Sequence, residues 1–165
     1  MKTTAKTILV VILAGATAAL TMLIRIPMPA TSGYVNLGDV AVIFCGLFLG
    51  GRLGALAGGI GSALADLMTG TFIYIPITFI AKGLEAWIAG TLGRKHFLWL
   101  FFATAVMVGS YFIAEVFFPG MGLSAALQEL IFNGIQGIAG ALGGYFIYRS
   151  VSLALPQLTN DQHHS

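Results

Sequence analysis

The sequence predicts an all-α integral membrane protein with six transmembrane helices, both termini in the cytoplasm, and a polar first loop as a lid over an outward-facing pocket. Of its 165 residues, 58% are hydrophobic and only 8% are charged, whereas about a quarter of the residues in a soluble domain are charged. The length suits roughly six spans joined by short loops. We therefore expect residues 1–156 to form a single membrane domain and residues 157–165 to form a polar C-terminal tail.

Six apolar segments of the chain are the expected transmembrane helices. They are Thr7–Ile24, Asp39–Gly50, Leu53–Met68, Phe72–Leu92, Phe97–Phe118 and Leu123–Tyr148. The second and third are shorter than the roughly 20 residues that a span usually needs, which predicts a thinned or funnelled region around them. The first is also compatible with a signal peptide, because Lys2 and Lys6 precede it and Ala16-Thr17-Ala18 resembles a cleavage site. Its apolar run continues past that site, so we expect an uncleaved first helix.

The distribution of basic residues predicts the orientation of the chain. With the N-terminus in the cytoplasm, Arg25 falls on the outer side of the membrane. All other basic residues that are not part of a span fall on the inner side. These inner residues are Lys2, Lys6, Arg52, Arg94, Lys95 and Arg149. The segment Arg25–Gly38 is then external, and its Pro, Thr, Ser and Gly residues predict a polar loop.

Under this orientation, most polar side chains within the spans fall in the outer half of the bundle. Ionisable groups are costly in a bilayer, so each is by default a candidate for a ligand contact. The polar residues are Asp39, Asp66, Glu115, Glu129, Asn133 and Gln136, with Lys82 near the middle of the fourth span and Glu85 three residues further in. We expect a pocket that opens outward, with the Arg25–Gly38 loop as its lid.

Several of these residues also have a purely structural interpretation. Lys82 and Glu85 could neutralise each other, because residues three apart meet on one helix face. Asp39 is suited to an N-cap, and Glu129 is near enough to the outer headgroups to be solvated, so we leave it out of the predicted site. No basic residue is near Asp66 in the sequence, which favours a role in binding.

The predicted substrate contacts combine hydrogen-bond acceptors, one cationic donor and one aromatic ring. They are Tyr34, Asn36, Asp39, Asp66, Lys82, Glu115, Asn133 and Gln136. Tyr34 is expected to stack on, or close over, a ring of the ligand. We expect replacement of Asp66 or Lys82 by alanine to weaken binding strongly without unfolding the protein.

The sequence motifs of common catalytic and cofactor sites are absent. There is no G-x-x-x-x-G-K-[ST], no H-E-x-x-H and no G-x-S-x-G. Cys45 is the only cysteine, and His96 is the only histidine outside the tail. We therefore expect no cofactor, no metal and no enzymatic activity in this chain. Two halves related by an internal repeat, typical of many secondary transporters, are not evident.

Four stretches resemble a known family. They are Tyr34–Asp39 (YVNLGD), Leu47–Gly54 (LFLGGRLG), Ala65–Leu67 (ADL) and Ala81–Glu85 (AKGLE). With the length, the six expected spans and the polar first loop, they resemble the substrate-binding S components of energy-coupling factor (ECF) vitamin transporters. The resemblance covers nearly the whole chain. It points to the riboflavin-transporter-like branch, nearest to members assigned to hydroxymethylpyrimidine or pyridoxine-type compounds.

The resemblance implies a substrate-capture subunit in a bacterial cell membrane. Such a subunit takes a small water-soluble vitamin or precursor from outside, and a transmembrane coupling protein (the T component) with two ATPase subunits drives uptake. The resemblance maps the coupling contact onto Ala14 and Ala18, and Gly15 lies in the same face of small residues. A free-standing ion-coupled carrier is the main alternative. A metal-using membrane enzyme and a purely structural subunit are further ones.

Overall fold

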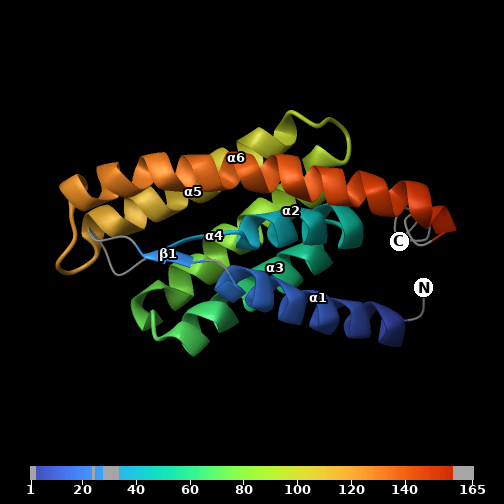
Figure 1. The fold of residues 1–165 in the computed structure, drawn as a ribbon, viewed down its shortest axis with the longest axis horizontal. Coiled ribbons are helices and arrows are strands. Elements are labelled where there is room, and N and C mark those ends of the chain that lie inside the picture. The colour runs from blue at the N-terminus through green and yellow to red at the C-terminus, as the bar shows by residue number, and fades with distance from the viewer. Residues whose placement is uncertain (1–2, 24, 28–33, 158–165) are drawn as a thin grey trace.

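The computed structural model describes residues 3–23, 25–27 and 34–157. Over these residues the chain forms six α-helices and one two-stranded antiparallel ribbon (Figure 1). The helices are α1 (Thr3–Leu23), α2 (Gly38–Leu49), α3 (Gly51–Thr69), α4 (Ile75–Ile88), α5 (Trp99–Phe117) and α6 (Leu123–Ala154). The strands are β1 (Arg25–Pro27) and β2 (Tyr34–Asn36). A short 3-10 turn, η1 (Phe72–Tyr74), precedes α4, and a π-helical turn, η2 (Ala89–Gly93), follows it.

Four helical segments of the described chain are long and apolar enough to cross a membrane. They are Thr4–Leu23, Phe72–Gly93, Trp99–Phe117 and Leu123–Ala154. The 12 residues of α2 rise only about 18 Å, too little to cross a hydrocarbon core about 30 Å thick. The 19 residues of α3 are long enough to cross it. However, seven of them are Gly, Arg or Asp, which lowers the hydropathy of the helix. The all-α membrane fold is confirmed, with four full-length apolar spans among the described helices.

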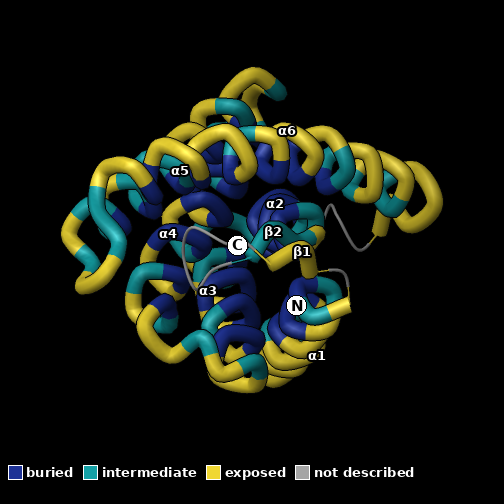
Figure 2. Tube along the Cα trace, turned by 60° about the vertical axis from the view of Figure 1, so that its left-hand side comes forward, coloured by how far each residue is buried: buried dark blue, intermediate teal, exposed yellow. Residues whose placement is uncertain are grey.

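The shortest helix, α2, lies in the centre of the bundle, where it packs against α1, α3, α4 and α6 (Figure 2). Toward its C-terminal end, Ile43 and Leu47 are fully buried and belong to an apolar core with Ile88 and Leu100. At its N-terminal end, Asp39 is equally buried. The interior is therefore apolar at one end of α2 and polar at the other.

Glycines allow the close approach of α2 and α3 and the turn between them. Gly50 joins the two helices with φ of +86°, a left-handed conformation that favours glycine. A Cβ atom on Gly54 would lie only 2.6 Å from the Cα of Gly46. Larger residues at these positions would push the two helices apart, as is typical where small residues mediate packing of membrane helices.

The segment expected to be a loop contains a short ribbon. Arg25 pairs with Asn36, and Pro27 pairs with Tyr34. Residue 24 and residues 28–33 of this segment, like residues 158–165 of the expected tail, are outside the described residues. The ribbon fixes the position of Tyr34 and Asn36 above the polar end of the bundle, which a sequence reading based on Pro and Gly content did not predict.

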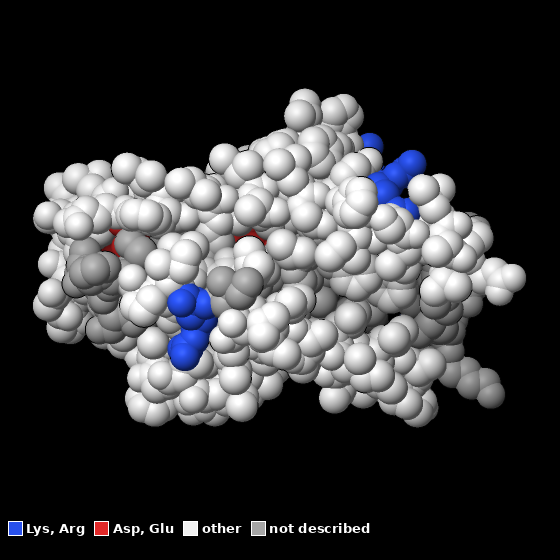
Figure 3. All heavy atoms as spheres, viewed as in Figure 1, with Lys and Arg blue, Asp and Glu red and all other residues white. Residues whose placement is uncertain are grey.

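The outer surface has the character of a lipid-facing surface. Figure 3 shows that one face of the molecule carries very few charged groups. Large apolar side chains are exposed along the outer sides of α1 and α6, including Val11, Ile12, Ile131 and Ile135. The start of α1 and the end of α6 lie at the same end of the bundle (Figure 1). A cytoplasmic location for that end stays a prediction from the basic residues.

Candidate binding site

A small polar cavity lies inside the bundle next to β2. Its volume is about 30 Å³, which is room for one or two water molecules. Its lining comes from α1, β2, α3, η1, α4, α5 and α6, and comprises Thr21, Tyr34, Asn36, Ser62, Asp66, Tyr74, Thr78, Lys82, Tyr111, Glu129, Asn133 and Gln136. A ring-shaped ligand would require these side chains to move apart.

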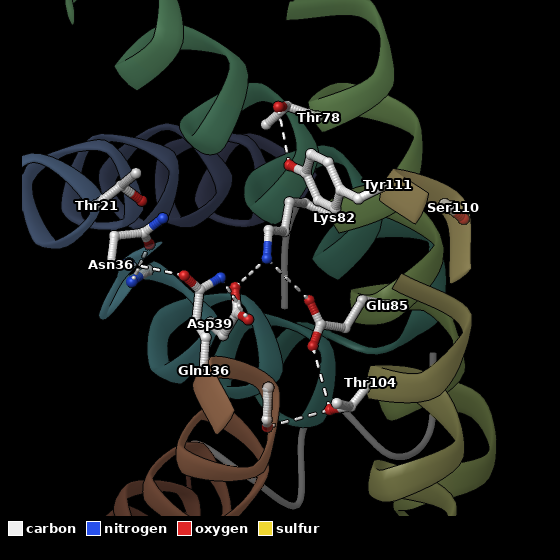
Figure 4. A network of polar contacts seen from close by, with 12 residues as sticks. Thr21, Asn36, Asp39, Thr78, Lys82, Glu85, Thr104, Ser110, Tyr111 and Gln136 are labelled. Carbon is white, nitrogen blue, oxygen red and sulfur yellow. Dashed lines mark hydrogen bonds and ion pairs between the residues drawn. The ribbon is translucent and has the colours of Figure 1, made fainter. Parts of the chain in front are cut away.

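Lys82 of α4 lies at the centre of a buried ion cluster (Figure 4). Its ammonium group forms an ion pair with the carboxylate of Asp39 on α2, and it lies 3.7 Å from Oε2 of Glu85. The ring centroid of Tyr111 is 5.5 Å from the Lys82 Nζ, within range of a cation–π contact. All four side chains are buried. Because one cation serves two carboxylates, the loss of Lys82 would leave negative charge uncompensated in the interior.

Gln136 of α6 connects this ion cluster to β2. Its Nε2 donates a hydrogen bond to Oδ2 of Asp39 over 3.0 Å, and its Oε1 accepts one from the backbone N–H of Asn36 over 2.7 Å. These two partners fix the orientation of the amide, since a carboxylate only accepts and an N–H only donates. The side chain of Asn36 in turn accepts from the backbone N–H of Gly38 over 2.6 Å. Strand β2 is therefore anchored to α2 and α6.

Tyr34 closes the cavity from the side of β2. Its hydroxyl donates to Oδ1 of Asp66 over 2.7 Å, and Thr71 donates to the same oxygen over 3.1 Å. Burial, followed by the neighbouring Asp66 carboxyl group, raises the pKa of Tyr34 above its ordinary value, so the hydroxyl stays protonated and remains a donor. The guanidinium of Arg25 lies 5.1 Å from the centroid of the Tyr34 ring. The hydrogen bond between Tyr34 of β2 and Asp66 of α3 is the contact that closes the cavity.

Some polar atoms around the cavity have no hydrogen-bond partner within the described part of the chain. They are the Ser62 Oγ, the Asp66 Oδ2 and the Glu129 Oε1. Buried polar atoms are normally hydrogen-bonded, so unpaired ones around a cavity indicate that the site suits a polar guest. Glu115 is fully buried behind Glu129, with which its carboxyl group interacts. Among the described residues, no three His, Cys, Asp or Glu side chains form a metal-binding group.

Most of the predicted substrate contacts come together at this cavity. Six of the eight line it, namely Tyr34, Asn36, Asp66, Lys82, Asn133 and Gln136. The other two lie behind lining residues: Asp39 behind Lys82 and Gln136, and Glu115 behind Glu129. Whether any of them contacts a substrate stays a prediction.

The structural alternatives weighed for Asp39 and Lys82 have different outcomes. The capping interpretation of Asp39 is wrong, because Leu37 occupies the N-cap of α2 and the Asp39 carboxylate bonds to Lys82 and Gln136 instead. The Asp39 carboxylate instead turns inward to Lys82. The Lys82–Glu85 pair is present, but it is not self-contained, because Asp39 shares the cation. Lys82 is thus part of the packing as well as of the cavity wall.

The predicted coupling residues of α1 are placed differently from expectation. Ala14 and Ala18 are only 6% and 7% exposed, and they lie on the same side of α1 as Thr17, which faces Gly61 of α3. Only Gly15 of the predicted three is exposed. Thr17 and Thr21 share this buried face, and their hydroxyls donate to backbone carbonyl oxygens of α1 itself. The small residues of this part of α1 that remain exposed are Gly15, Ala16 and Ala19, of which Gly15 and Ala19 are four residues apart.

Several cavity residues were not among the predicted substrate contacts. They are Thr21, Ser62, Tyr74, Thr78, Tyr111 and Glu129. Helical spacing could have found four of them, since residues four apart share a face. By one such step, Ser62 precedes Asp66, Thr78 precedes Lys82, Tyr111 precedes Glu115, and Glu129 precedes Asn133. The positions of Thr21 and Tyr74 depend on how separate elements pack, which spacing within one helix does not reveal.

The apolar helices and the polar interior cavity define a multi-pass membrane protein. The chain belongs to the family of the ECF-type riboflavin transporter S component, whose sequence model matches residues 1–153. This family is one of transporter components and not of enzymes. The family resemblance drawn from the sequence motifs is thus confirmed.

Two curated relatives cover most of the chain. An uncharacterized protein of Pyrococcus woesei is 35% identical over 130 residues, covering 75% of this chain and 86% of the relative. The thiamine precursor transporter HmpT of Lactococcus lactis subsp. cremoris is 33% identical over 119 residues, covering 72% of this chain and 70% of the relative. The second relative supports the hydroxymethylpyrimidine-type branch indicated by the sequence.

Proposed function

We propose that this protein captures a hydroxymethylpyrimidine-like vitamin precursor from outside the cell, as the substrate-binding subunit of an ATP-driven importer. The observation that carries the proposal is the set of unpaired polar atoms around a cavity that Tyr34 closes. Its support from relatives is the similarity to a thiamine precursor transporter. A pyridoxine-like ligand, also a small hydroxymethylated nitrogen ring, is the second candidate within the same class.

The chemistry of the cavity suits an aminopyrimidine that carries a hydroxymethyl group. Such a ring donates hydrogen bonds from its amino group, accepts them at its ring nitrogens, and does both at its hydroxyl. Asp66 and Glu129 offer carboxyl oxygens to the amino group, and the amide of Asn133 offers a donor and an acceptor. The aromatic ring of Tyr111 provides a face for stacking.

Binding of such a ligand requires the site to open. The cavity of about 30 Å³ is far below the 300 Å³ or more that is typical of small-molecule sites. The hydrogen bond between Tyr34 and Asp66 is the closure nearest to β2. We infer that the ribbon of β1 and β2 moves away as this bond breaks. The same step exposes both oxygens of Asp66 to the incoming ligand.

Energy for uptake comes from partner subunits in this proposal, because the chain has no ATP-binding motif. The partners are a T component and two ATPase subunits. Their contact includes the outer side of α1 around Gly15 and Ala19, which are exposed, rather than the buried Ala14 and Ala18. Small residues four apart permit close approach of a second membrane helix.

The decisive experiment is a titration of the purified protein with hydroxymethylpyrimidine, thiamine, pyridoxine and riboflavin, read by native mass spectrometry. Asp66→Asn keeps the size of the side chain and removes a charged acceptor. Since hydrogen bonds to charged groups contribute about 1.5–3 kcal/mol, we expect its affinity to fall about 10- to 150-fold. Gln128→Ala, on the exposed side of α6, is the control and should bind normally.

Two results would contradict the proposal. One is a wild-type protein that binds no member of the panel, and the other is an Asp66→Asn variant with unchanged affinity. Uptake by the chain alone in vesicles, driven by a proton or sodium gradient, would instead support the ion-coupled carrier.

A further inference from the structure

A second, apolar groove opens on the outside of the bundle between α3 and α4. Its volume is about 410 Å³, within the range of small-molecule sites. Ala55 and Gly83 form its floor, while Leu56, Ile80 and Trp87 form parts of its walls. The side chains of Leu56, Ile80 and Trp87 are 45–53% exposed. From Ile80 to Trp87 the groove follows α4 for about 10 Å.

One end of this groove carries a cation. Arg52, in the first turn of α3, is exposed and lines the groove near Trp87. Within the described residues, Arg52 makes no ion pair or hydrogen bond to another side chain. Arg94 differs, because it donates to the carbonyl oxygens of Leu47 and Phe48 over 2.7 Å each. Arg52 is therefore available to an external anion.

No acidic side chain of the described chain competes for this position. The acids of the helices are all buried inside the bundle, and they are Asp39, Asp66, Glu85, Glu115 and Glu129. Arg52 also belongs to the predicted cytoplasmic side, where the leaflet contains anionic lipids that attract basic residues. Trp87 is beside it, as is typical of an aromatic residue at the headgroup level.

We propose that this groove binds one anionic phospholipid, with the lipid phosphate at Arg52 and one acyl chain along Trp87, Leu84 and Ile80 toward the membrane centre. An arginine fork matches two phosphate oxygens. The apolar floor and walls match a hydrocarbon chain, and the groove has no polar group deeper along α4. The site is separate from the polar cavity, because none of its lining residues is shared with it.

The test is lipid titration of the delipidated protein, measured by native mass spectrometry with phosphatidylglycerol and phosphatidylcholine of identical acyl chains. We expect the wild-type protein to prefer phosphatidylglycerol about fivefold, which corresponds to about 1 kcal/mol for one basic residue near the surface. Arg52→Gln should remove the preference, and Arg52→Lys should retain most of it. Arg149→Gln, another exposed cation, is the matched control and should keep it.

A second variant tests the groove rather than the charge. Gly83→Leu fills the floor, and an added Cβ there meets only the Ala55 carbonyl oxygen, at an ordinary 3.6 Å, so the fold should be retained. We expect loss of the one-to-one complex with either lipid. Gly109→Leu on α5, where nothing lies within 4 Å of an added Cβ, should bind lipid normally. Equal binding of both lipids by the wild type, an unchanged preference in Arg52→Gln, or unchanged binding in Gly83→Leu would each overturn the proposal.

Discussion

The buried cluster of Lys82, Asp39 and Glu85 makes a sharp prediction about stability. Lys82→Met keeps an unbranched side chain but removes the only cation that contacts the two carboxylates among the described residues. Breaking a buried pair in this way costs about 3–5 kcal/mol. For a chain of this size, about 1 kcal/mol corresponds to about 2–4 °C in the midpoint of thermal unfolding. We therefore expect the midpoint to fall by about 6–20 °C.

The two carboxylates should not contribute equally. Asp39 is the closer partner of Lys82 and also accepts from Gln136, whereas Glu85 lies at 3.7 Å and accepts a long bond of 3.4 Å from Thr104. Asp39→Asn should therefore destabilise the protein almost as much as Lys82→Met. Glu85→Gln removes the surplus negative charge and should cost no more than about 1 kcal/mol.

The assay is thermal unfolding followed by tryptophan fluorescence, at one detergent concentration, pH and heating rate. The double variant Lys82→Met with Asp39→Asn completes the cycle, and its loss should be smaller than the sum of the single losses by about 0.5–3 kcal/mol. A midpoint for Lys82→Met equal to that of Glu85→Gln would refute this reasoning. So would strict additivity in the double variant, because the two side chains would then not be coupled.

Two further predictions concern closure and coupling. Tyr34→Phe removes the hydroxyl that bonds Asp66, so the site should open more readily and the association rate constant of the ligand should rise about tenfold. Stopped-flow fluorescence measures this rate constant. An unchanged rate constant would show that the bond does not limit ligand entry. Gly15→Leu adds a large side chain where nothing lies within 4 Å of a Cβ, so ligand affinity should be unchanged while ATP-driven uptake in reconstituted vesicles is lost. Normal uptake by that variant would place the coupling contact elsewhere.

The structure also changes one expectation about mutants. Replacement of Lys82 by alanine was expected to weaken binding without affecting the fold. Because Lys82 neutralises buried carboxylates of two helices, its loss should lower both stability and binding. Asp66 is the cleaner test of the site, since one of its oxygens has no hydrogen-bond partner among the described residues.

The sequence by itself determined the class of the molecule. An apolar composition with few charges requires a membrane environment, and the lengths of the apolar runs indicated helices close to those observed, including a short second one. The cost of burying ionisable groups also singled out Asp66 and Lys82, which do lie at the cavity. These inferences succeed because they depend on local properties, namely hydropathy, helical periodicity and the desolvation of single charges.

Only the tertiary structure decided which groups meet. Asp39 and Gln136 are far apart in the sequence yet share a hydrogen bond, and no periodicity within α2 or α6 specifies that contact. The rotation of α1 about its axis, which buries Ala14 and exposes Gly15, follows from how Thr17 packs against Gly61 of α3. Such features depend on the simultaneous packing of several helices. The energy of each contact is set by its partners from distant parts of the chain, so one segment read alone does not contain it.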